Sequence, residues 1–143
     1  MNYSKHIQNY ALFFENLNKD ISIQEYEDIF SEDIYFEDPF QKTKGINSIY
    51  NIFDHMYKSL DEPRFIVKEI VENKNIAYLQ WNFIFKYKNC KDVESFTGVS
   101  RIELNEDLKV VSHIDYWDAA SNIYEKVPVL KSILRFIKNK IKA

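Results

Sequence analysis

The N-terminal part of the chain places its apolar side chains at the spacing of helices. Ser4 is suited to cap a first helix, whose apolar positions recur every third or fourth residue: Ile7, Tyr10, Ala11, Phe14 and Leu17. Ser22 and Glu25 have the spacing of a capping box, which predicts a short second helix to about Phe30. Gly45 opens a third helix with a clear apolar stripe, made of Ile46, Ile49, Tyr50, Phe53, Tyr57 and Leu60.

Beyond Pro63 apolar and polar side chains alternate, which is the period of a strand. This pattern predicts strands at 64–72, 76–88, 93–104 and 109–118. Residues 76–88 alternate most clearly, with one apolar face made of Ala77, Leu79, Trp81, Phe83, Phe85 and Tyr87. A short strand, 34–36, precedes the third helix and ends before Pro39, and residues 41–44 are predicted to form a polar loop. Helices followed by hairpin-linked strands predict an α+β fold with an antiparallel sheet.

The C-terminal segment is predicted to be an amphipathic helix. It begins near Ser121, is interrupted at Pro128 and continues over 129–142. Its apolar side consists of Val129, Leu130, Ile133, Leu134, Ile137 and Ile141, and its basic side of Lys131, Arg135, Lys138 and Lys142. We therefore divide the chain of 143 residues into one domain, 1–125, and a basic helix, 126–143.

Charge is distributed unevenly between these two parts. The net charge is -3, and residues 126–143 carry six basic and no acidic side chains, so residues 1–125 carry -9. An acidic domain is poorly suited to contact phosphates, so we expect no nucleic-acid partner. The basic helix either packs on the domain, closing its opening or covering the sheet, or it docks on an anionic membrane surface or a partner.

The sequence has no feature of a secreted or membrane-spanning protein. Cys90 is the single cysteine, which rules out an internal disulfide and fits a reducing compartment. No apolar run approaches the ~20 residues that cross a bilayer, and the first residues lack the pattern of a secretory signal. We therefore expect a cytoplasmic location. Aromatic residues make up 16% of the chain, enough to line an apolar cavity, although the joint abundance of Ile, Asn and Lys fits a compositional bias equally well.

Candidate chemistry is concentrated in the last predicted strand. Alternation places His113, Asp115 and Trp117 on one face of it. With residues 106–107 as the turn, Asp115 pairs with Gly98 and His113 with Ser100, and Gly98 leaves room for a ligand or another backbone. His113 and Asp115 are then either a general acid/base pair in an aromatic cavity or a buried polar pair that only fixes the strand.

Other candidates have a structural and a functional interpretation. Asp38 either caps the turn at Pro39 or supplies a second carboxylate to the site. Tyr10, on the buried face of the first helix, either donates its hydroxyl to a developing oxyanion or belongs to the core. We expect no metal, because neither His6 nor His55 is predicted to point toward His113. With two glycines in the chain and no phosphate-binding loop, we also expect no cofactor.

The order of elements resembles the nuclear transport factor 2-like superfamily, and within it the SnoaL-like branch. The residues that carry this resemblance, over about 5–120, are Phe36-Glu37-Asp38-Pro39-Phe40, Gly45, Phe96-Thr97-Gly98-Val99-Ser100-Arg101 and His113 to Asp118. It implies a cone-shaped, curved antiparallel or mixed sheet with the three helices across its cavity. It also implies a homodimer through the convex sheet face. Polyketide cyclases and ketosteroid isomerases of this superfamily use a carboxylate as base, which Asp38 and Asp115 would match. Arg101-Ile102-Glu103 only partly matches the Asp-Arg-Asp arrangement of its epoxide hydrolases.

Together these observations predict a domain that binds a small lipophilic molecule. In the catalytic interpretation, isomerase- or cyclase-type acid/base chemistry on a carbonyl compound uses Asp115 as base, with His113 and Asp38 beside it. We expect the ligand to be contacted by Tyr10, Phe14, Phe53, Trp81, Phe83, Gly98 and Trp117. The alternative is a non-catalytic ligand-binding or dimerisation domain, peripheral at membranes through residues 126–143.

Overall fold

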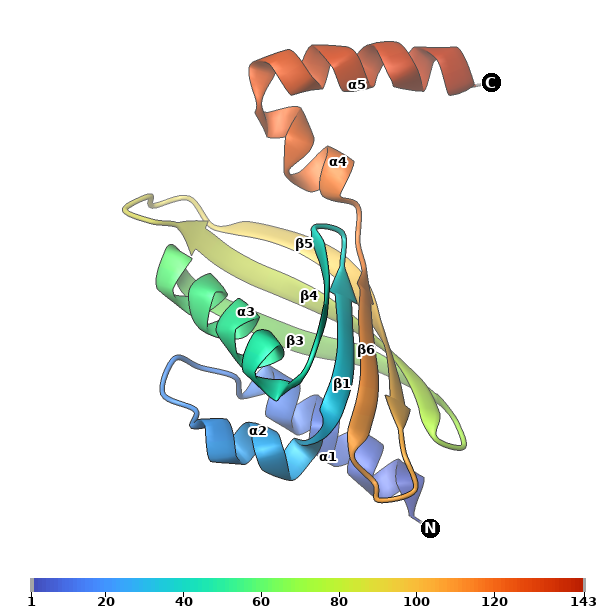
Figure 1. Ribbon diagram of the computed structural model, residues 1–143. Coiled ribbons are helices and arrows are strands. Elements are labelled where there is room, and N and C mark those ends of the chain that lie inside the picture. Colours follow the sequence, from blue (N-terminus) through green and yellow to red (C-terminus); the bar gives the residue numbers. More distant parts are fainter. Residues whose placement is uncertain (1, 143) are drawn as a thin grey trace.

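The computed structural model describes residues 2–142, apart from the side chain of Glu125, and has the predicted α+β architecture (Figure 1). Three helices come first in the chain: α1 (Tyr3–Glu15), α2 (Ile23–Ile29) and α3 (Ile46–Ser59). Six strands form one sheet: β1 (Phe30–Asp38), β2 (Gln41–Lys44), β3 (Leu60–Asn73), β4 (Ile76–Tyr87), β5 (Glu94–Leu104) and β6 (Val110–Tyr116). The chain then continues through α4 (Ala119–Asn122), the short 3₁₀ turn η1 (Tyr124–Lys126) and α5 (Pro128–Ile141).

The sheet is curved, and α1, α2 and α3 lie on its concave side (Figure 1). Its strand order is β2-β1-β6-β5-β4-β3. Four of the five strand pairs are antiparallel, but β1 and β6 run parallel, with Phe36 paired to His113. The sheet is therefore mixed rather than wholly antiparallel. The long chain between β1 and β6 permits a parallel pairing, which a tight hairpin cannot form.

Residues 41–44 form strand β2, so the prediction of a loop there is wrong. These polar residues pair with β1 across the turn at Pro39, and Phe36 lies opposite Thr43. Strand β2 lies at one edge of the sheet and is mostly exposed, so it shows no apolar alternation. Strand β1 also begins earlier than predicted, at Phe30, directly after α2.

Two further boundaries differ from the sequence pattern. The first helix is capped by Asn2, whose side chain accepts the backbone N–H of Lys5, and not by Ser4. The third helix ends at Ser59, and Leu60 already belongs to β3, which continues through Pro63. Proline is tolerated there because β3 is an edge strand with an irregular register between Asp61 and Arg64.

The core fills the space between the helices and the concave face of the sheet. Residues of β4 alternate as predicted, and Ala77, Leu79, Trp81, Phe83 and Phe85 are buried. From the helices the largest buried side chains are those of Tyr10, Phe14, Tyr26 and Phe53. The rings of Phe14 and Phe65 stack at 4.1 Å between centroids, which joins α1 to β3.

Helix α5 projects away from the sheet (Figure 1), and none of its residues is buried. The interpretation in which its apolar face closes the opening or covers the sheet is therefore wrong for this structure. Among residues 2–142, no helix is long and apolar enough to cross a membrane.

Candidate functional site

Strand register places the candidate residues two positions from the predicted pairs. Asp115 lies opposite Ser100 and His113 opposite Ile102, instead of Gly98 and Ser100. The hairpin turn is longer than two residues, because the Asn105 N–H bonds to the Lys109 carbonyl. The register also shifts next to Leu104, a bulge that the sequence pattern does not reveal. A shift of two keeps every side chain on its face, so the predicted division of faces holds.

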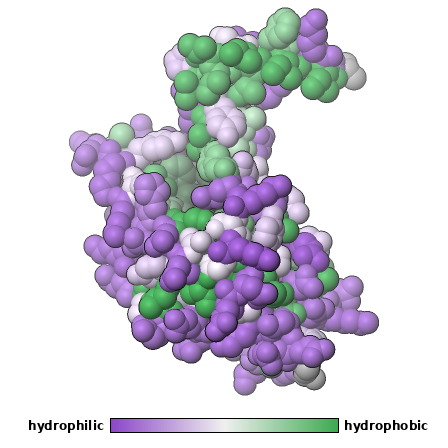
Figure 2. Space-filling view, in the orientation of Figure 1, coloured by the Kyte–Doolittle hydropathy of each residue, from purple (hydrophilic) through white to green (hydrophobic). Residues whose placement is uncertain are grey.

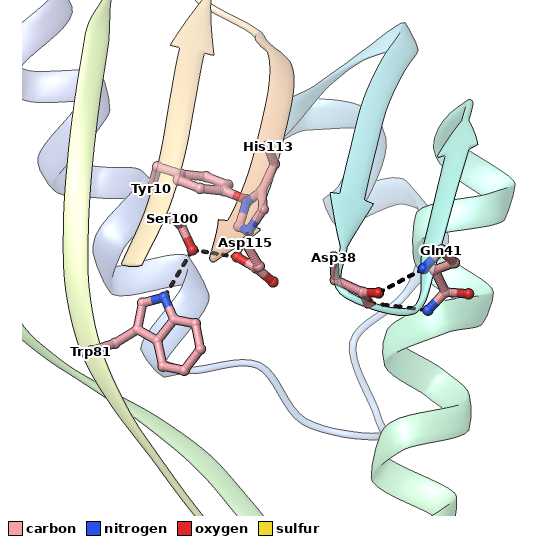
Figure 3. Close-up of polar contacts among 7 residues, drawn as sticks. All are labelled: Tyr10, Asp38, Gln41, Trp81, Ser100, His113 and Asp115. Carbon is pink, nitrogen blue, oxygen red and sulfur yellow. Dashed lines mark hydrogen bonds and ion pairs between the residues drawn. The ribbon is translucent and has the colours of Figure 1, made fainter. Parts of the chain in front are cut away.

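Five buried side chains form one hydrogen-bonded network at this place (Figure 3). His113 Nε2 and Asp115 Oδ1 are 2.6 Å apart, and Ser100 Oγ donates to the same Oδ1 at 2.5 Å. Trp81 Nε1 donates to Ser100 Oγ at 2.8 Å, and the Tyr10 hydroxyl lies 2.6 Å from His113 Nδ1. Each of the five residues is at most 9% exposed. The network joins α1 to three neighbouring strands, β4, β5 and β6.

One set of proton positions satisfies the whole network. Burial raises the pKa of Tyr10 well above its ordinary value, and the charge of Asp115 adds to this effect, so the phenol keeps its proton. The Tyr10 hydroxyl then donates to Nδ1 of His113, which leaves the ring proton on Nε2 to donate to Asp115. Asp115 Oδ1 thus accepts hydrogen bonds from both His113 and Ser100.

The second carboxylate oxygen of Asp115 has a different environment. Oδ2 accepts no hydrogen bond from the described side chains, and Figure 3 shows it directed away from Ser100 and His113. Asp115 also lines a cavity of about 320 Å³. The wall is mainly aromatic and includes Phe36, Phe53, Phe65, Trp81, Phe83, Phe85, Phe96 and Trp117. One oxygen of this carboxylate is therefore anchored, while the other accepts no hydrogen bond from the described side chains, on a residue that borders the apolar cavity.

Most of the predicted ligand contacts lie at this cavity. Phe53, Trp81, Phe83 and Trp117 are in its wall. Tyr10 and Phe14 are not; they pack behind His113, with the rings of Phe14 and His113 5.5 Å apart. Because its hydroxyl is bound to Nδ1 of His113, Tyr10 is not placed to donate to an oxyanion in the cavity.

Gly98 makes room for a side chain of the protein and not for a ligand. It lies opposite Trp81 on β4, and an added Cβ would meet the indole ring at 2.6 Å from Cζ2. The prediction that Gly98 leaves room opposite Asp115 is therefore wrong. The glycine instead allows the indole to lie across β5 and reach Ser100.

Asp38 lies at the cavity rim and holds a turn. Its Oδ1 accepts the backbone N–H groups of Phe40 and Gln41 at 2.8 and 3.0 Å, and its Oδ2 accepts the side-chain amide of Gln41 at 3.1 Å (Figure 3). These contacts match the turn-capping interpretation of Asp38. Both oxygens are engaged, in contrast to those of Asp115.

Sequence reasoning missed several site residues: the polar Ser100 and His55, and aromatic residues of the wall such as Phe36, Phe65, Phe85 and Phe96. Ser100 lies on the predicted face but pairs with Asp115 and not with His113, and this pairing brings its hydroxyl to the carboxylate. His55 is exposed on α3 and lines the rim of the cavity. Among the residues that the structure describes, no group of three or more His, Cys, Asp or Glu side chains is arranged to hold a metal ion.

Comparisons with known proteins agree with the fold described above. A family model described as a SnoaL-like domain matches residues 11–113. The sequence matches none of the curated proteins with which it was compared. Among solved structures, a candidate SnoaL-like polyketide cyclase from Jannaschia sp. superposes with a TM-score of 0.72 at 9% identity, covering 82% of this chain and 88% of that chain.

Two further structures have the same fold. A hypothetical protein with a ketosteroid isomerase-like fold from Catenulispora acidiphila, in complex with trimethylamine, has a TM-score of 0.69 at 10% identity and covers 82% of this chain and 88% of that chain. A candidate isomerase of the SnoaL-like family from Agrobacterium tumefaciens has a TM-score of 0.64 at 15% identity and covers 82% of this chain and 97% of that chain. At such identities the likeness establishes the cone-shaped fold and leaves the chemistry to the site itself.

Proposed function

The chain belongs to the SnoaL-like domain family, and we propose that it binds a small lipophilic carbonyl compound and transfers a proton on it through Asp115. The observation that supports this proposal is the difference in hydrogen bonding between the two Asp115 oxygens. Oδ1 accepts hydrogen bonds from His113 and Ser100, whereas Oδ2 is directed away from both and accepts none from the described side chains. Such a carboxylate is oriented and also available to a ligand.

The proposed step needs no cofactor. Asp115 Oδ2 takes a proton from the carbon between a carbonyl and a double bond, and the electrons of that C–H bond form an enolate. The same carboxyl then returns the proton to the far carbon of the double bond, so the product is an isomer of the substrate. The hydrogen bonds from His113 and Ser100 fix the position of Oδ1. His113, supported by Tyr10, keeps the carboxyl group in one orientation.

A non-catalytic binding function is the second candidate. Among the described lining residues, the other side chains that could donate to an enolate oxygen are the half-buried Trp117 and the exposed Gln41, His55, Ser59 and Tyr87. An unpaired carboxylate oxygen inside aromatic walls also suits a small ammonium cation through charge and cation–π attraction. The structural neighbour in complex with trimethylamine is consistent with such a ligand.

Isomerisation of a β,γ-unsaturated cyclohexenone, followed by the ultraviolet absorbance of its conjugated product, tests the first function. The Asp115→Asn variant keeps the shape of the side chain but removes the base, so turnover should fall about 100-fold or more. Asp107→Asn makes the same chemical change at an exposed turn and should leave turnover unchanged. Equal turnover by the two variants would show that Asp115 is not the base.

Calorimetric titration with trimethylammonium chloride tests the second function. If the cavity is an amine site, the wild-type protein binds the cation and Asp115→Asn does not, because the variant lacks the counter-charge. If neither protein binds the cation while the wild type turns over the ketone, the amine interpretation is wrong. Circular dichroism of each variant confirms that the fold is retained.

A further inference from the structure

Helix α5 presents a continuous apolar surface to solvent. The exposed fractions of Val129, Phe136 and Ile141 are 71%, 64% and 79%. Leu130, Ile133 and Ile137 are each at least 40% exposed and complete the same side of the helix. Figure 2 shows this surface as a green band that is set apart from the mainly purple body. A soluble domain rarely exposes so many large apolar side chains along one helix without a partner for them.

The other side chains of α5 are predominantly basic. Lys131, Arg135, Lys138 and Lys140 lie within the helix and Lys142 follows it, and this segment contains no acidic residue. Lys140 lies over the ring of Phe136, with Nζ 5.2 Å from the ring centroid. The aliphatic part of the Lys140 side chain can therefore pack along the apolar face while its ammonium group reaches toward anionic groups.

The rest of the chain is acidic, in contrast to α5. Residues 1–125 carry -9, and the segment from Glu25 to Asp33 alone contains five acidic and no basic residues. That segment comprises most of α2 and the start of β1, at the end of the domain farthest from α5 (Figure 1). An anionic surface would attract the α5 end of the molecule and repel the α2 end, so the charges define one orientation.

The cavity rim lies at the same end of the molecule as α5. It includes Phe40 in the β1–β2 turn, Gln41 at the start of β2, His55 near the end of α3, and Ile123 just after α4. The ring of Phe40 packs on Trp117 at 5.3 Å and on Tyr124 at 6.0 Å, so the segment that leads to α5 borders the rim directly.

We propose that α5 lies flat on an anionic lipid surface and holds the cavity rim toward that surface. A helix of 14 residues is about 21 Å long, too short to span a bilayer but well suited to lie in its interface. Docking by α5 is independent of the chemistry at Asp115. If the rim faces the lipid, a lipophilic ligand can enter the cavity directly from the lipid. This consequence of docking, unlike the docking itself, rests on the proposed function.

A second copy of the chain is a less suitable occupant. Two α5 helices packed face to face would bring two strongly basic segments together. On the body, the exposed large apolar side chains are those of Leu12, Phe40, Val71, Tyr78, Tyr87, Val93 and Tyr116. Val71 and Tyr78 are neighbours across β3 and β4, but this pair is much smaller than the row of six apolar side chains on α5. A homodimer through the convex sheet face, as the family resemblance implies, would leave α5 available to lipid.

Vesicle sedimentation with the full chain tests the docking. Wild-type protein should bind vesicles of phosphatidylcholine and phosphatidylglycerol but not vesicles of phosphatidylcholine alone, and added salt should weaken the binding. Replacing Lys131, Arg135 and Lys142 together by Gln should lower the partition coefficient about 100-fold. The matched control replaces Lys5, Lys19 and Lys74 by Gln, which gives the same net charge and should bind as wild type.

The apolar contribution is tested with Ile133→Glu, against Val71→Glu as the control on the body. Both positions are half exposed, at 50% and 56%, so neither change should unfold the domain. Only the α5 variant should lose vesicle binding. The docking proposal is wrong if the α5 variants bind like their controls. It is also wrong if light scattering shows, without vesicles, a dimer that Ile133→Glu dissociates, because α5 would then pack on a second copy.

Orientation is measured by energy transfer to a dye on the lipid headgroups. Cys90, the single cysteine, is exposed in the β4–β5 turn, which lies at the same end of the sheet as α5, and the β5–β6 turn lies at the opposite end (Figure 1). A donor on Cys90 should transfer more energy than a donor at position 107 of the Cys90→Ser/Asp107→Cys variant. The reverse order would show that the rim faces away from the lipid.

Discussion

Replacing Gly98 by Ala should displace Trp81 and disturb the site without touching Asp115. An ideal Cβ on Gly98 would lie 2.6 Å from Cζ2 and 2.8 Å from Cζ3 of the indole, whereas ordinary contact begins at 3.4 Å. The Cβ would lie closer still to Cη2, so the ring must retreat by more than the 0.8 Å that Cζ2 alone requires. It has little room, because Trp81 is 1% exposed and its ring packs on Phe65 at 5.1 Å and on Phe96 at 6.2 Å.

The energetic cost has two unfavourable parts and one favourable part. Overpacking a filled core costs about 1–3 kcal/mol. The hydrogen bond from Trp81 Nε1 to Ser100, 2.8 Å long, stretches beyond 3.5 Å if the ring moves away from it, and its loss costs about 1 kcal/mol more. Alanine restricts the unfolded chain and returns about 0.4–1 kcal/mol. Overpacking outweighs this gain, so we expect a net loss of about 2–3 kcal/mol.

Urea unfolding followed by circular dichroism measures this loss, and near-ultraviolet dichroism reports the environment of Trp81. A double-mutant cycle with Trp81→Phe isolates the contact. The smaller ring relieves the overlap, so the double variant should be more stable than the sum of the single changes by about 1 kcal/mol or more. If Gly98→Ala loses less than about 0.5 kcal/mol, or the two changes are additive, Trp81 and Gly98 are not packed as described.

Two further predictions concern buried phenols. Tyr10→Phe leaves Nδ1 of His113 buried without a donor, so unfolding free energy should fall by about 1–3 kcal/mol in urea titrations, and an unchanged value would exclude this hydrogen bond. Burial raises the pKa of Tyr10, Tyr26 and Tyr57 above the ordinary value of 10, so above pH 10 the folded chain holds protons that the unfolded chain releases. The contribution of these three tyrosines to the free energy of unfolding is therefore complete below about pH 10 and is lost as pH rises further. Urea midpoints measured against pH should show this loss. Ionisation of all ten tyrosines near pH 10 in the still-folded protein would contradict the prediction.

Local periodicity identified most helices and strands, because it depends only on which side of an element faces the core. The alternation in β4 and the apolar stripe of α3 are strong examples. The same signal could not reveal β2, whose residues Gln41–Lys44 are polar and become a strand only by pairing with β1. It also could not show that β1 and β6 are parallel neighbours, since this pairing joins residues more than seventy positions apart.

Helix α5 marks another limit of the same reasoning. Its amphipathic pattern predicted a helix correctly, with a boundary error of one residue at either end. The pattern contains no information on what covers the apolar side, and the structure shows that side exposed and not packed on the sheet. Amphipathicity indicates that a partner surface exists, whereas tertiary structure decides whether the chain itself supplies it.

Strand alternation, a local property, located the candidate site. Strand pairing, which depends on distant residues, was predicted incorrectly. His113 and Asp115 share a face because strands alternate, and a register error of two positions does not alter this. An error of one position would have turned both side chains to the convex face. Their actual partners come from distant positions: Tyr10 reaches His113 from α1, and Ser100 reaches Asp115 across the strand pair. Gly98 depends on the same pairing, because its missing side chain admits the indole that donates to Ser100. The orientation of Asp115 therefore rests partly on a glycine that contacts no ligand, and Gly98→Ala should lower turnover of the ketone while leaving the carboxylate chemically intact.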